Sequence, residues 1–173
     1  MFALVLIGAP GSGKTSVLEA LSDMLVVEDI RHALIETEAL TSAHPALGDE
    51  QWVQPIAAVC GLYRRFGYEL LLVAVTVETV KDLHRALEAV DADDHAVVRL
   101  QAEPATLRRR LIAREHAGWS GLDDLLDATT RMAPLVAGLD GVALTLTTEG
   151  QRADAVADRI RDAFPGALRR TEG

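Results

Sequence analysis

Apolar runs of strand length alternate along this chain with longer runs in which apolar residues recur at helical spacing. Residues 79–90 show the helical pattern most clearly, because Val80, Leu83, Leu87 and Val90 fall on one side of a helix. The strands predicted from this alternation cover residues 3–7, 33–37, 68–77, 96–100 and 142–147. The predicted helices cover residues 14–25, 51–66, 79–90, 104–115, 122–137 and 152–163.

The most continuous apolar run extends from Tyr68 to Val77 and leaves no polar face for solvent. Such a strand is typical of a parallel sheet that helices cover on both sides. The repeated strand–helix units therefore predict an α/β fold, with an open, doubly wound, five-stranded parallel sheet and helices on both faces. Right-handed crossovers bring the carboxyl ends of such strands to one edge, where ligands bind. We therefore expect the functional residues in the segments that follow each strand.

The whole pattern fits into one domain. With 173 residues, 49% of them hydrophobic, the chain is long enough to bury a core of its own. We expect this domain to cover residues 1–167 and a frayed tail to cover residues 168–173, because Pro165 and Gly166 follow the last helix. The only cysteine, Cys60, excludes an internal disulfide and is expected to be a small buried hydrophobe.

Charge and hydropathy argue against several classes of partner. The net charge of −9 disfavours broad binding to nucleic acids or anionic membranes. No apolar run approaches the roughly 20 residues of a membrane-spanning helix. The first apolar run has no basic segment before it, so we do not expect a signal peptide. Together with the single cysteine, these features predict a cytoplasmic protein with no nucleic-acid and no membrane partner.

The first predicted strand leads into a glycine-rich turn with the pattern G-x-x-x-x-G-K-[ST], in which Gly8, Gly13, Lys14 and Thr15 hold the fixed positions. This is the Walker A pattern, in which backbone N–H groups and a helix N-terminus surround nucleotide phosphates. Lys14 can reach the β- and γ-phosphates, and the Thr15 hydroxyl can bind Mg²⁺. A turn that binds nothing is the alternative, but the strand before it, the helix after it and the presence of only one other lysine, Lys81, argue against that. The residues predicted to bind the nucleotide here are Gly8, Ala9, Pro10, Gly11, Ser12, Gly13, Lys14, Thr15 and Ser16.

Acidic residues follow the second and third predicted strands. Glu36 and Glu38 lie at the end of the second strand. Phosphoryl transfer to a hydroxyl needs a carboxylate that orients or deprotonates that hydroxyl, and others that hold Mg²⁺ through water. The alternative is a solvated acidic strand end. After the third strand no Walker B aspartate is present, and Glu78 is equally well explained as a first-turn acid of the next helix.

Arginines are concentrated in the helix that follows the fourth strand. Arg110 and Arg114 are one turn apart and share a face, so their guanidinium groups can clamp phosphates and stabilise the charge that develops during transfer. Arg108 and Arg109 are weaker candidates for this role. The alternative is a solvated basic helix end, which the helix dipole favours.

These motifs resemble those of the small P-loop kinases related to nucleoside monophosphate kinases, which include shikimate kinase, gluconate kinase and chloramphenicol phosphotransferase. The resemblance covers nearly the whole chain and implies the kinase-type strand order 2-3-1-4-5. Glu36-Thr37-Glu38 falls where enzymes similar to shikimate kinase carry Asp-x-Asp, which implies that Glu36 holds Mg²⁺ through water and that Glu38 faces the acceptor hydroxyl. Each glutamate reaches one methylene further than the family's aspartate.

Three further segments resemble this family more loosely. Arg110 and Arg114 occupy the ends of an R-L-x-x-R pattern that supplies lid arginines. Arg131 precedes a proline in a stretch similar to R-x-P-L, whose arginine contacts phosphate or substrate. Thr148 follows the last strand, in a loop like the one that packs against adenine.

The resemblance also locates a lid and an acceptor site. The lid is short, covers residues 114–122, and contains Trp119, which either covers the closed site or simply packs. The acceptor-binding region is expected at about residues 39–66, and the G-G-G turn of shikimate kinase is missing after the third strand, so shikimate is not the expected acceptor. The residues predicted to contact the acceptor are Glu38, Trp52, Arg64 and Arg131.

The sequence thus predicts an ATP- and Mg²⁺-dependent kinase that phosphorylates a hydroxyl of a neutral or weakly charged small molecule, such as a nucleoside, a sugar or a natural product. A nucleotide-binding regulatory or degenerate kinase-like protein is the alternative. A GTPase is less well supported, because no N-K-x-D motif is present. The expected partners are the nucleotide and the acceptor, and the chain is expected to be a monomer or a homodimer. The predicted catalytic residues are Lys14, Glu38, Arg110 and Arg114.

Overall fold

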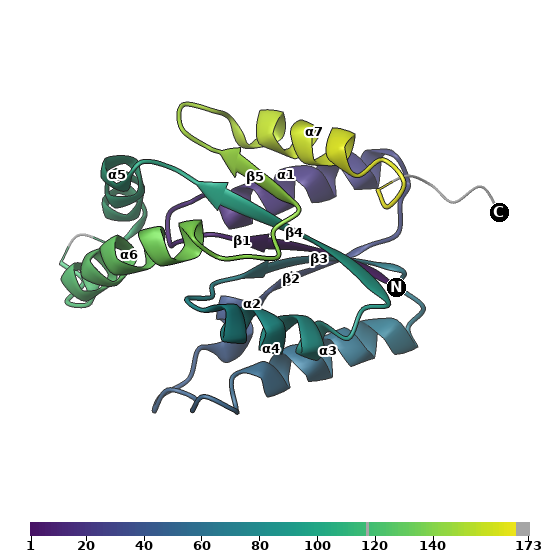
Figure 1. The fold of residues 1–173 in the computed structure, drawn as a ribbon, viewed down its shortest axis with the longest axis horizontal. Helices are drawn as coiled ribbons and strands as arrows, with labels where there is room; N and C mark the ends of the chain where they lie inside the picture. The colour runs from purple at the N-terminus through teal and green to yellow at the C-terminus, as the bar shows by residue number, and fades with distance from the viewer. Residues whose placement is uncertain (117, 169–173) are drawn as a thin grey trace.

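The computed structural model describes residues 1–116 and 118–168 and forms three layers, with a parallel sheet between two layers of helices (Figure 1). The sheet order is β2-β3-β1-β4-β5, and all four strand pairs are parallel. This confirms the predicted fold class and the strand order that the kinase resemblance implies. The strands are β1 (Phe2–Ile7), β2 (Ala33–Glu36), β3 (Leu70–Val75), β4 (Asp94–Gln101) and β5 (Leu144–Thr147).

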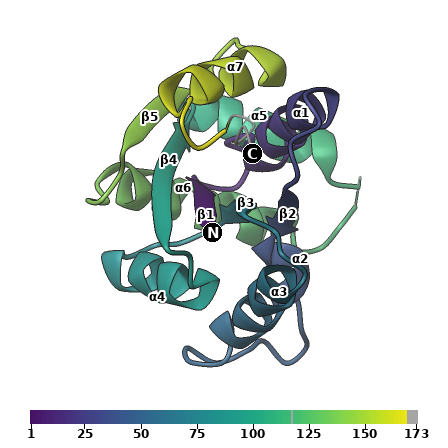
Figure 2. The same cartoon turned by 90° about the vertical axis from the view of Figure 1, so that its right-hand side faces the viewer.

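Helices cover both faces of the sheet and extend past its carboxyl edge. Figures 1 and 2 show α1 and α7 on one face, α3 and α4 on the other, and α5 and α6 beyond the ends of the strands. The longer helices match the predicted ranges to within a few residues. The helices are α1 (Lys14–Val27), α2 (Thr37–Thr41), α3 (Val53–Arg65), α4 (Val80–Val90), α5 (Pro104–Arg114), α6 (Leu122–Ala137) and α7 (Ala153–Ala163).

The central strand β1 contributes to two separate apolar cores because its successive side chains point to opposite faces. Ala3, Val5 and Ile7 pack with α3 and α4, whereas Leu4 and Leu6 pack with α1 and α7. The strand is therefore apolar at every position, as expected for a strand buried on both sides. Ile7 is level with Val75 of β3 and Arg99 of β4, so the loop after β1 leaves the sheet between its two neighbours.

Cys60 of α3 is buried in the core that α3 and α4 share, as predicted. Burial raises the pKa of its thiol to about 11, because the thiolate would lose its hydration. At neutral pH this side chain is a thiol that serves packing. Among residues 1–116 and 118–168, no helix is long and apolar enough to cross a membrane.

The structure corrects the prediction at the end of the second strand. The strand predicted to reach Thr37 ends at Glu36, and the short helix α2 begins at Thr37. The edge strand β2 pairs only with β3, and this pairing ends with Glu36 opposite Ala74. The Thr41 hydroxyl then donates to the Thr37 carbonyl at 2.9 Å and supports the helical turn. Glu38 consequently lies in the first turn of a helix instead of in an extended segment.

The C-terminal segment is packed further than expected. Leu168, the first residue of the predicted frayed tail, is fully buried in the core formed with α1 and α7. Its N–H donates to the Phe164 carbonyl at 3.1 Å. The rest of that predicted tail, residues 169–173, lies outside the described residues.

Candidate active site

In the loop between β1 and α1, the backbone requires glycine at Gly8 and at Gly11 for different reasons. A Cβ at Gly8 would lie 2.6 Å from the Leu100 carbonyl oxygen and nearer still to the Ser12 hydroxyl, so no side chain fits there. Gly11 has φ of +80°, a region that L-residues rarely adopt, and a Cβ there would approach the Leu107 carbonyl oxygen at 2.9 Å. The loop is therefore shaped by close contacts with β4 and α5, as well as by its own sequence.

Lys14 is the cation at the centre of this loop. Its side chain is only 8% exposed, and its Nζ donates to the Gly8 carbonyl at 2.8 Å and lies 3.9 Å from Glu38 Oε1. Burial lowers the pKa of Lys14, and the nearby Glu38 carboxylate opposes that effect. A desolvated ammonium of this kind is stabilised by additional negative charge, so Lys14 is suited to bind an anion such as phosphate.

The two predicted acids approach the loop from different elements. Glu36 ends β2 and is half-buried, whereas Glu38 belongs to α2 and is exposed. The Glu38 Oε1 atom also accepts a hydrogen bond from the hydroxyl of Thr76, which directly follows β3. Glu38 is thus held between Lys14 on one side and Thr76 on the other.

A cavity of about 460 Å³ brings the predicted residues together. Its oxygen donors include the Thr15 hydroxyl and the Glu36 and Glu38 carboxylates, and oxygen ligands are those that Mg²⁺ prefers. In the described ranges, no group of three or more His, Cys, Asp or Glu side chains could hold a metal without other ligands. The donor set therefore fits Mg²⁺ that keeps waters and phosphate oxygens as its remaining ligands. The predicted residues that line this cavity are Pro10, Gly11, Gly13, Lys14, Thr15, Ser16, Glu36, Glu38, Arg110 and Arg114.

Arg110 connects three segments at the edge of this cavity. Its guanidinium donates to the Gly11 carbonyl at 3.1 Å, to the Thr148 hydroxyl at 2.9 Å and to the Thr148 carbonyl at 2.7 Å. The Thr148 hydroxyl is buried and in turn donates to the Ser12 carbonyl at 3.0 Å. A smaller cavity of about 280 Å³ adjoins this network and is lined by Arg110, Thr148 and Gln151.

Arg114 and Trp119 of the predicted lid are exposed to solvent. The Arg114 side chain is 59% exposed, and its Nε donates to Glu115 Oε1 at 2.8 Å. Trp119 is exposed and covers Gly121, where a Cβ would lie 2.5 Å from the indole ring. Residue 117 of the predicted lid lies outside the described residues.

Ala9 and Ser12 face away from the phosphate side of the loop. Both are buried and line a separate cavity of about 470 Å³ between the end of β4 and α6. The Ser12 hydroxyl has no hydrogen-bond partner among the described residues. Neither Ala9 nor Ser12 lines the cavity that contains Lys14.

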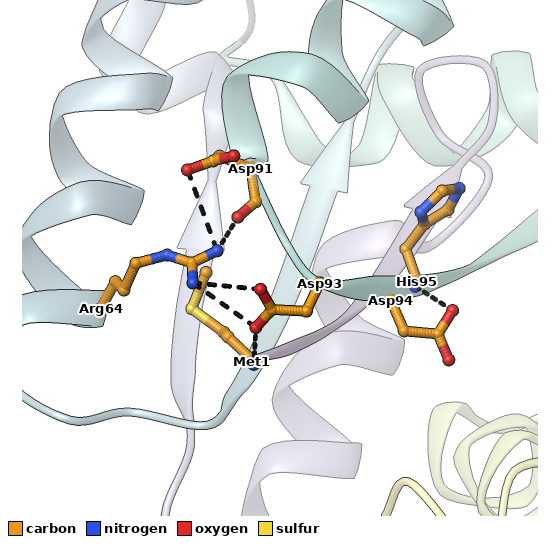
Figure 3. Close-up of polar contacts among 6 residues, drawn as sticks. All are labelled: Met1, Arg64, Asp91, Asp93, Asp94 and His95. Carbon is orange, nitrogen blue, oxygen red and sulfur yellow. Dashed lines mark hydrogen bonds and ion pairs between the residues drawn. The ribbon is translucent and has the colours of Figure 1, made fainter.

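Three predicted acceptor residues do not join the cavity. Arg64 forms ion pairs with Asp91 at 3.8 Å and Asp93 at 3.4 Å, beside the amino group of Met1 (Figure 3). Because Met1 precedes β1, this cluster lies at the opposite end of that strand from the loop. Trp52 packs against the core shared by α3 and α4, and Arg131 is exposed on α6.

Thr76 and Glu149 are among the residues around the site that the sequence reasoning missed. Thr76 holds Glu38, and Glu149 contacts the start of α5, where the Thr106 hydroxyl donates to its Oε1 at 2.7 Å. Thr76 directly follows β3 and Glu149 is the second residue after β5, so both lie at the carboxyl edge of the sheet. Their position after a strand was the available sequence signal for a functional role, but neither a threonine nor a glutamate marks a motif by itself.

A family model described as an AAA domain matches residues 4–135, which is more than half of the chain. The chain belongs to this AAA-domain family. The matched range includes the P-loop and helix α5 with its arginines, and it ends in α6. No curated protein matches the chain.

Solved structures of small-molecule kinases share the fold of this AAA-domain protein. A sugar kinase from Janibacter sp. HTCC2649 superposes with a TM-score of 0.72 at 15% identity, over 99% of both chains. The APS kinase CysC of Mycobacterium tuberculosis, in complex with AMPPNP and APS, superposes with a TM-score of 0.68 at 16% identity, over 94% of this chain and 96% of that chain. A gluconokinase from Sinorhizobium meliloti 1021 superposes with a TM-score of 0.62 at 21% identity, over 95% of this chain and 90% of that chain. The structural neighbours thus belong to the group of small P-loop kinases that the sequence resembles, and at these identities the likeness concerns the fold.

Proposed function

We propose that this protein is an ATP- and Mg²⁺-dependent kinase that transfers the γ-phosphoryl group to a hydroxyl of a small molecule. The observation that carries this proposal is the pairing of Lys14 Nζ with Glu38 Oε1 at 3.9 Å in one cavity. A cation suited to the transferred phosphate thereby lies beside a carboxylate suited to the attacking hydroxyl. The fold shared with small-molecule kinases supports the same reaction class.

The donor side binds ATP through the loop and α5. Lys14 and Arg110 neutralise the β- and γ-phosphates, and Arg114 adds charge from the outer turn of α5. Thr15 would hold Mg²⁺ directly and Glu36 would hold it through water, and the bound ion would further neutralise the phosphate oxygens. The cavity lined by Arg110, Thr148 and Gln151 binds the nucleoside part of ATP.

On the acceptor side, Glu38 orients the attacking hydroxyl. The acceptor oxygen forms a bond to the γ-phosphorus while the bond from that phosphorus to the β,γ-bridging oxygen breaks, and ADP leaves. The hydroxyl proton passes to the Glu38 carboxylate. Thr76 engages Oε1, which leaves Oε2 free to accept that proton.

The charges around the cavity favour an uncharged acceptor. Its three cationic side chains, Lys14, Arg110 and Arg114, are all assigned to the phosphates, and Glu36 and Glu38 remain beside the acceptor. Arg64, the arginine expected to contact the acceptor, is engaged at the far end of the sheet. We therefore propose a neutral hydroxyl compound such as a sugar, a nucleoside or a natural product, used in the reducing cytoplasm.

A transfer assay on a panel of neutral hydroxyl compounds tests this function. We expect the unsubstituted chain to phosphorylate at least one of them, and Glu38→Gln to bind ATP with unchanged affinity while transfer falls by about 10²- to 10⁴-fold. Glu78→Gln is the matched control, because Glu78 is an exposed acid just past β3 and outside the cavity. Tight ATP binding without transfer to any compound would contradict the kinase and favour a nucleotide-binding regulator.

A further inference from the structure

The start of α5 is held by a carboxylate from a distant part of the chain. Glu149 follows β5, and its Oε2 accepts from the Glu103 N–H at 3.2 Å while its Oε1 accepts from the Thr106 hydroxyl at 2.7 Å. Glu103 is the N-cap of α5 and Thr106 is its third residue. In a capping box, an acid at that third position reaches back to the N-cap N–H. Here that position is occupied by Thr106, and the acid comes from the loop after β5 instead.

The neighbouring residue, Thr148, holds the same helix two turns later. Glu103, Thr106 and Arg110 are separated by three and four positions, so they lie on one face of α5. Thr148 accepts two hydrogen bonds from Arg110 and donates one to the Ser12 carbonyl, and its N–H donates to the Gln101 carbonyl at 2.8 Å. Two consecutive residues thereby tie one face of α5 to the phosphate loop and to the end of β4.

Electrostatics favour an ionised Glu149 at this position. The hydrogen bond from the Thr106 hydroxyl lowers the pKa of Glu149, and the Glu103 N–H and the charges of Arg110 and Arg109 act in the same direction. An anion at a helix N-terminus is also stabilised by the helix dipole. Glu149 is therefore a permanent negative charge at neutral pH, and its hydrogen bonds to α5 are charge-assisted.

We propose that Glu149 is a positioning residue for nucleotide binding, which fixes the start of α5 and thereby presents the Arg110 guanidinium to the phosphate loop. This inference rests on the proposed use of Arg110 as a ligand of the ATP phosphates. Glu149 itself does not line either cavity that Arg110 borders. Its effect on ATP affinity is transmitted through the position of α5.

Isothermal titration with ATP on a double-mutant cycle tests the proposal. We expect Glu149→Ala to weaken ATP affinity by about five- to tenfold, because two hydrogen bonds to α5 are lost. In the Arg110→Ala background, Glu149→Ala is expected to cause no further loss, because the residue that it positions is gone. Thr106→Val is expected to weaken ATP binding in the same direction, and Thr106→Ser to restore it.

Asp154→Ala is the matched control for the cycle. Asp154 is an acid at the start of α7, and among the described residues its side chain forms hydrogen bonds to Arg152 and to the Ala155 N–H and none to α5. We expect its ATP affinity to equal that of the unsubstituted chain. Cooperative thermal unfolding of each variant confirms that the protein measured is folded.

The outcomes separate this inference from the proposed function. Unchanged ATP affinity in Glu149→Ala would overturn the inference alone, as would an equal loss in the presence and absence of Arg110, which would indicate a general structural effect. Absence of ATP binding by the unsubstituted chain would overturn the proposed function and this inference together. ATP binding with the expected coupling but without transfer to any acceptor would overturn the kinase and leave the role of Glu149 standing.

Discussion

The donor side and the acceptor side of the cavity are built in different ways. On the donor side, Arg110 and Thr148 bond to backbone carbonyls of the phosphate loop, and glycine is required where the loop meets β4. On the acceptor side, Glu38 is an exposed residue of a short helix, held by a hydrogen bond from Thr76. Main-chain contacts suit a ligand that many proteins share, whereas side chains on a short helix can change with the substrate. Nucleotide binding should therefore tolerate changes on the acceptor side.

Removal of the loop lysine should have the largest effect. Lys14→Ala deletes the buried ammonium that is expected to bind the transferred phosphate, so transfer should fall by at least about a hundredfold. Lys81→Ala is the matched control, because Lys81 is the only other lysine and is exposed on α4. Steady-state rates of phosphoryl transfer by both variants test this prediction. Equal activity of the two variants would remove Lys14 from the mechanism.

Addition of a single methyl group to the loop should damage the donor side through packing. Gly8→Ala places a Cβ 2.6 Å from the Leu100 carbonyl, so we expect a loss of about 1–3 kcal/mol in the free energy of unfolding together with weaker ATP binding. Gly61→Ala on α3 is the control, because no described atom outside the adjacent residues and backbone of its own helix lies within 4 Å of its new Cβ. That helical substitution should stabilise the protein by about 0.5–1 kcal/mol. Denaturant unfolding compares the two, and a Gly8→Ala protein as stable as the parent would contradict the close approach.

Glu36 provides a test of the boundary between the two sides. Glu36→Gln removes a carboxylate that is proposed to hold Mg²⁺ through water, so the Mg²⁺ concentration needed for half-maximal activity should rise by about 10- to 100-fold. Removal of Mg²⁺ with a chelator should stop transfer in the unsubstituted chain, and restored Mg²⁺ should recover it. A titration of activity against Mg²⁺ that coincides for Glu36→Gln and the parent would exclude Glu36 from the metal site.

Thr76 should affect the acceptor side alone. Thr76→Val keeps the shape of the side chain but removes the hydroxyl that holds Glu38 Oε1, so kcat should fall by about tenfold while the KM for ATP stays constant. Thr76→Ser retains the hydroxyl and should recover most of the rate. A change in the KM for ATP of the valine variant would show that the two sides are not separable in this way.

The smallest expected effect concerns pH and the capping contact of α5. The pKa of Glu149 is lowered in the folded state, chiefly by the Thr106 hydroxyl, so its stabilisation is complete above its ordinary value of 4.5 and is lost as pH falls through the lowered pKa. Glu149→Gln should therefore have a lower Tm than the parent at pH 7, and this difference should shrink below about pH 4.5. Thermal unfolding of both proteins from pH 7 to below about pH 4.5 measures this difference in Tm. A difference that stays constant with pH would indicate that ionisation of Glu149 contributes nothing.

The same contrast explains how far the sequence alone predicted the structure. The parallel sheet and the phosphate loop were predictable because their signals are local: continuous apolar strands and glycines at fixed spacing. The strand order was predicted from the resemblance to small P-loop kinases. The helix α2 was missed because five residues carry little periodicity, and β2 ends where its pairing with β3 ends. That termination depends on a partner distant in sequence.

The polar residues of the site were predicted unevenly for a related reason. Lys14 and Arg110 lie in elements whose position the motif defines, and they line the cavity together. Arg64 was expected near the acceptor from its charge and region, but α3 ends beside Asp91 and Asp93, which pair with it. Glu149 lies in the loop after the last strand, a loop that resembles in sequence one that packs against adenine. Its contact with Glu103 and Thr106 could not be predicted, because it depends on the pairing of β4 with β5.

The coupling of ADP formation to an acceptor is the most direct test of phosphoryl transfer within this cavity. ADP release is measured with and without each neutral hydroxyl compound, and the phosphorylated product is quantified in the same samples. If the cavity joins a donor site to an acceptor site, one compound should accelerate ADP formation and yield one phosphorylated molecule for each ADP, and Glu38→Gln should abolish that acceleration. ADP formation that no compound accelerates, in a chain that binds ATP, would contradict a kinase that acts on a neutral hydroxyl compound.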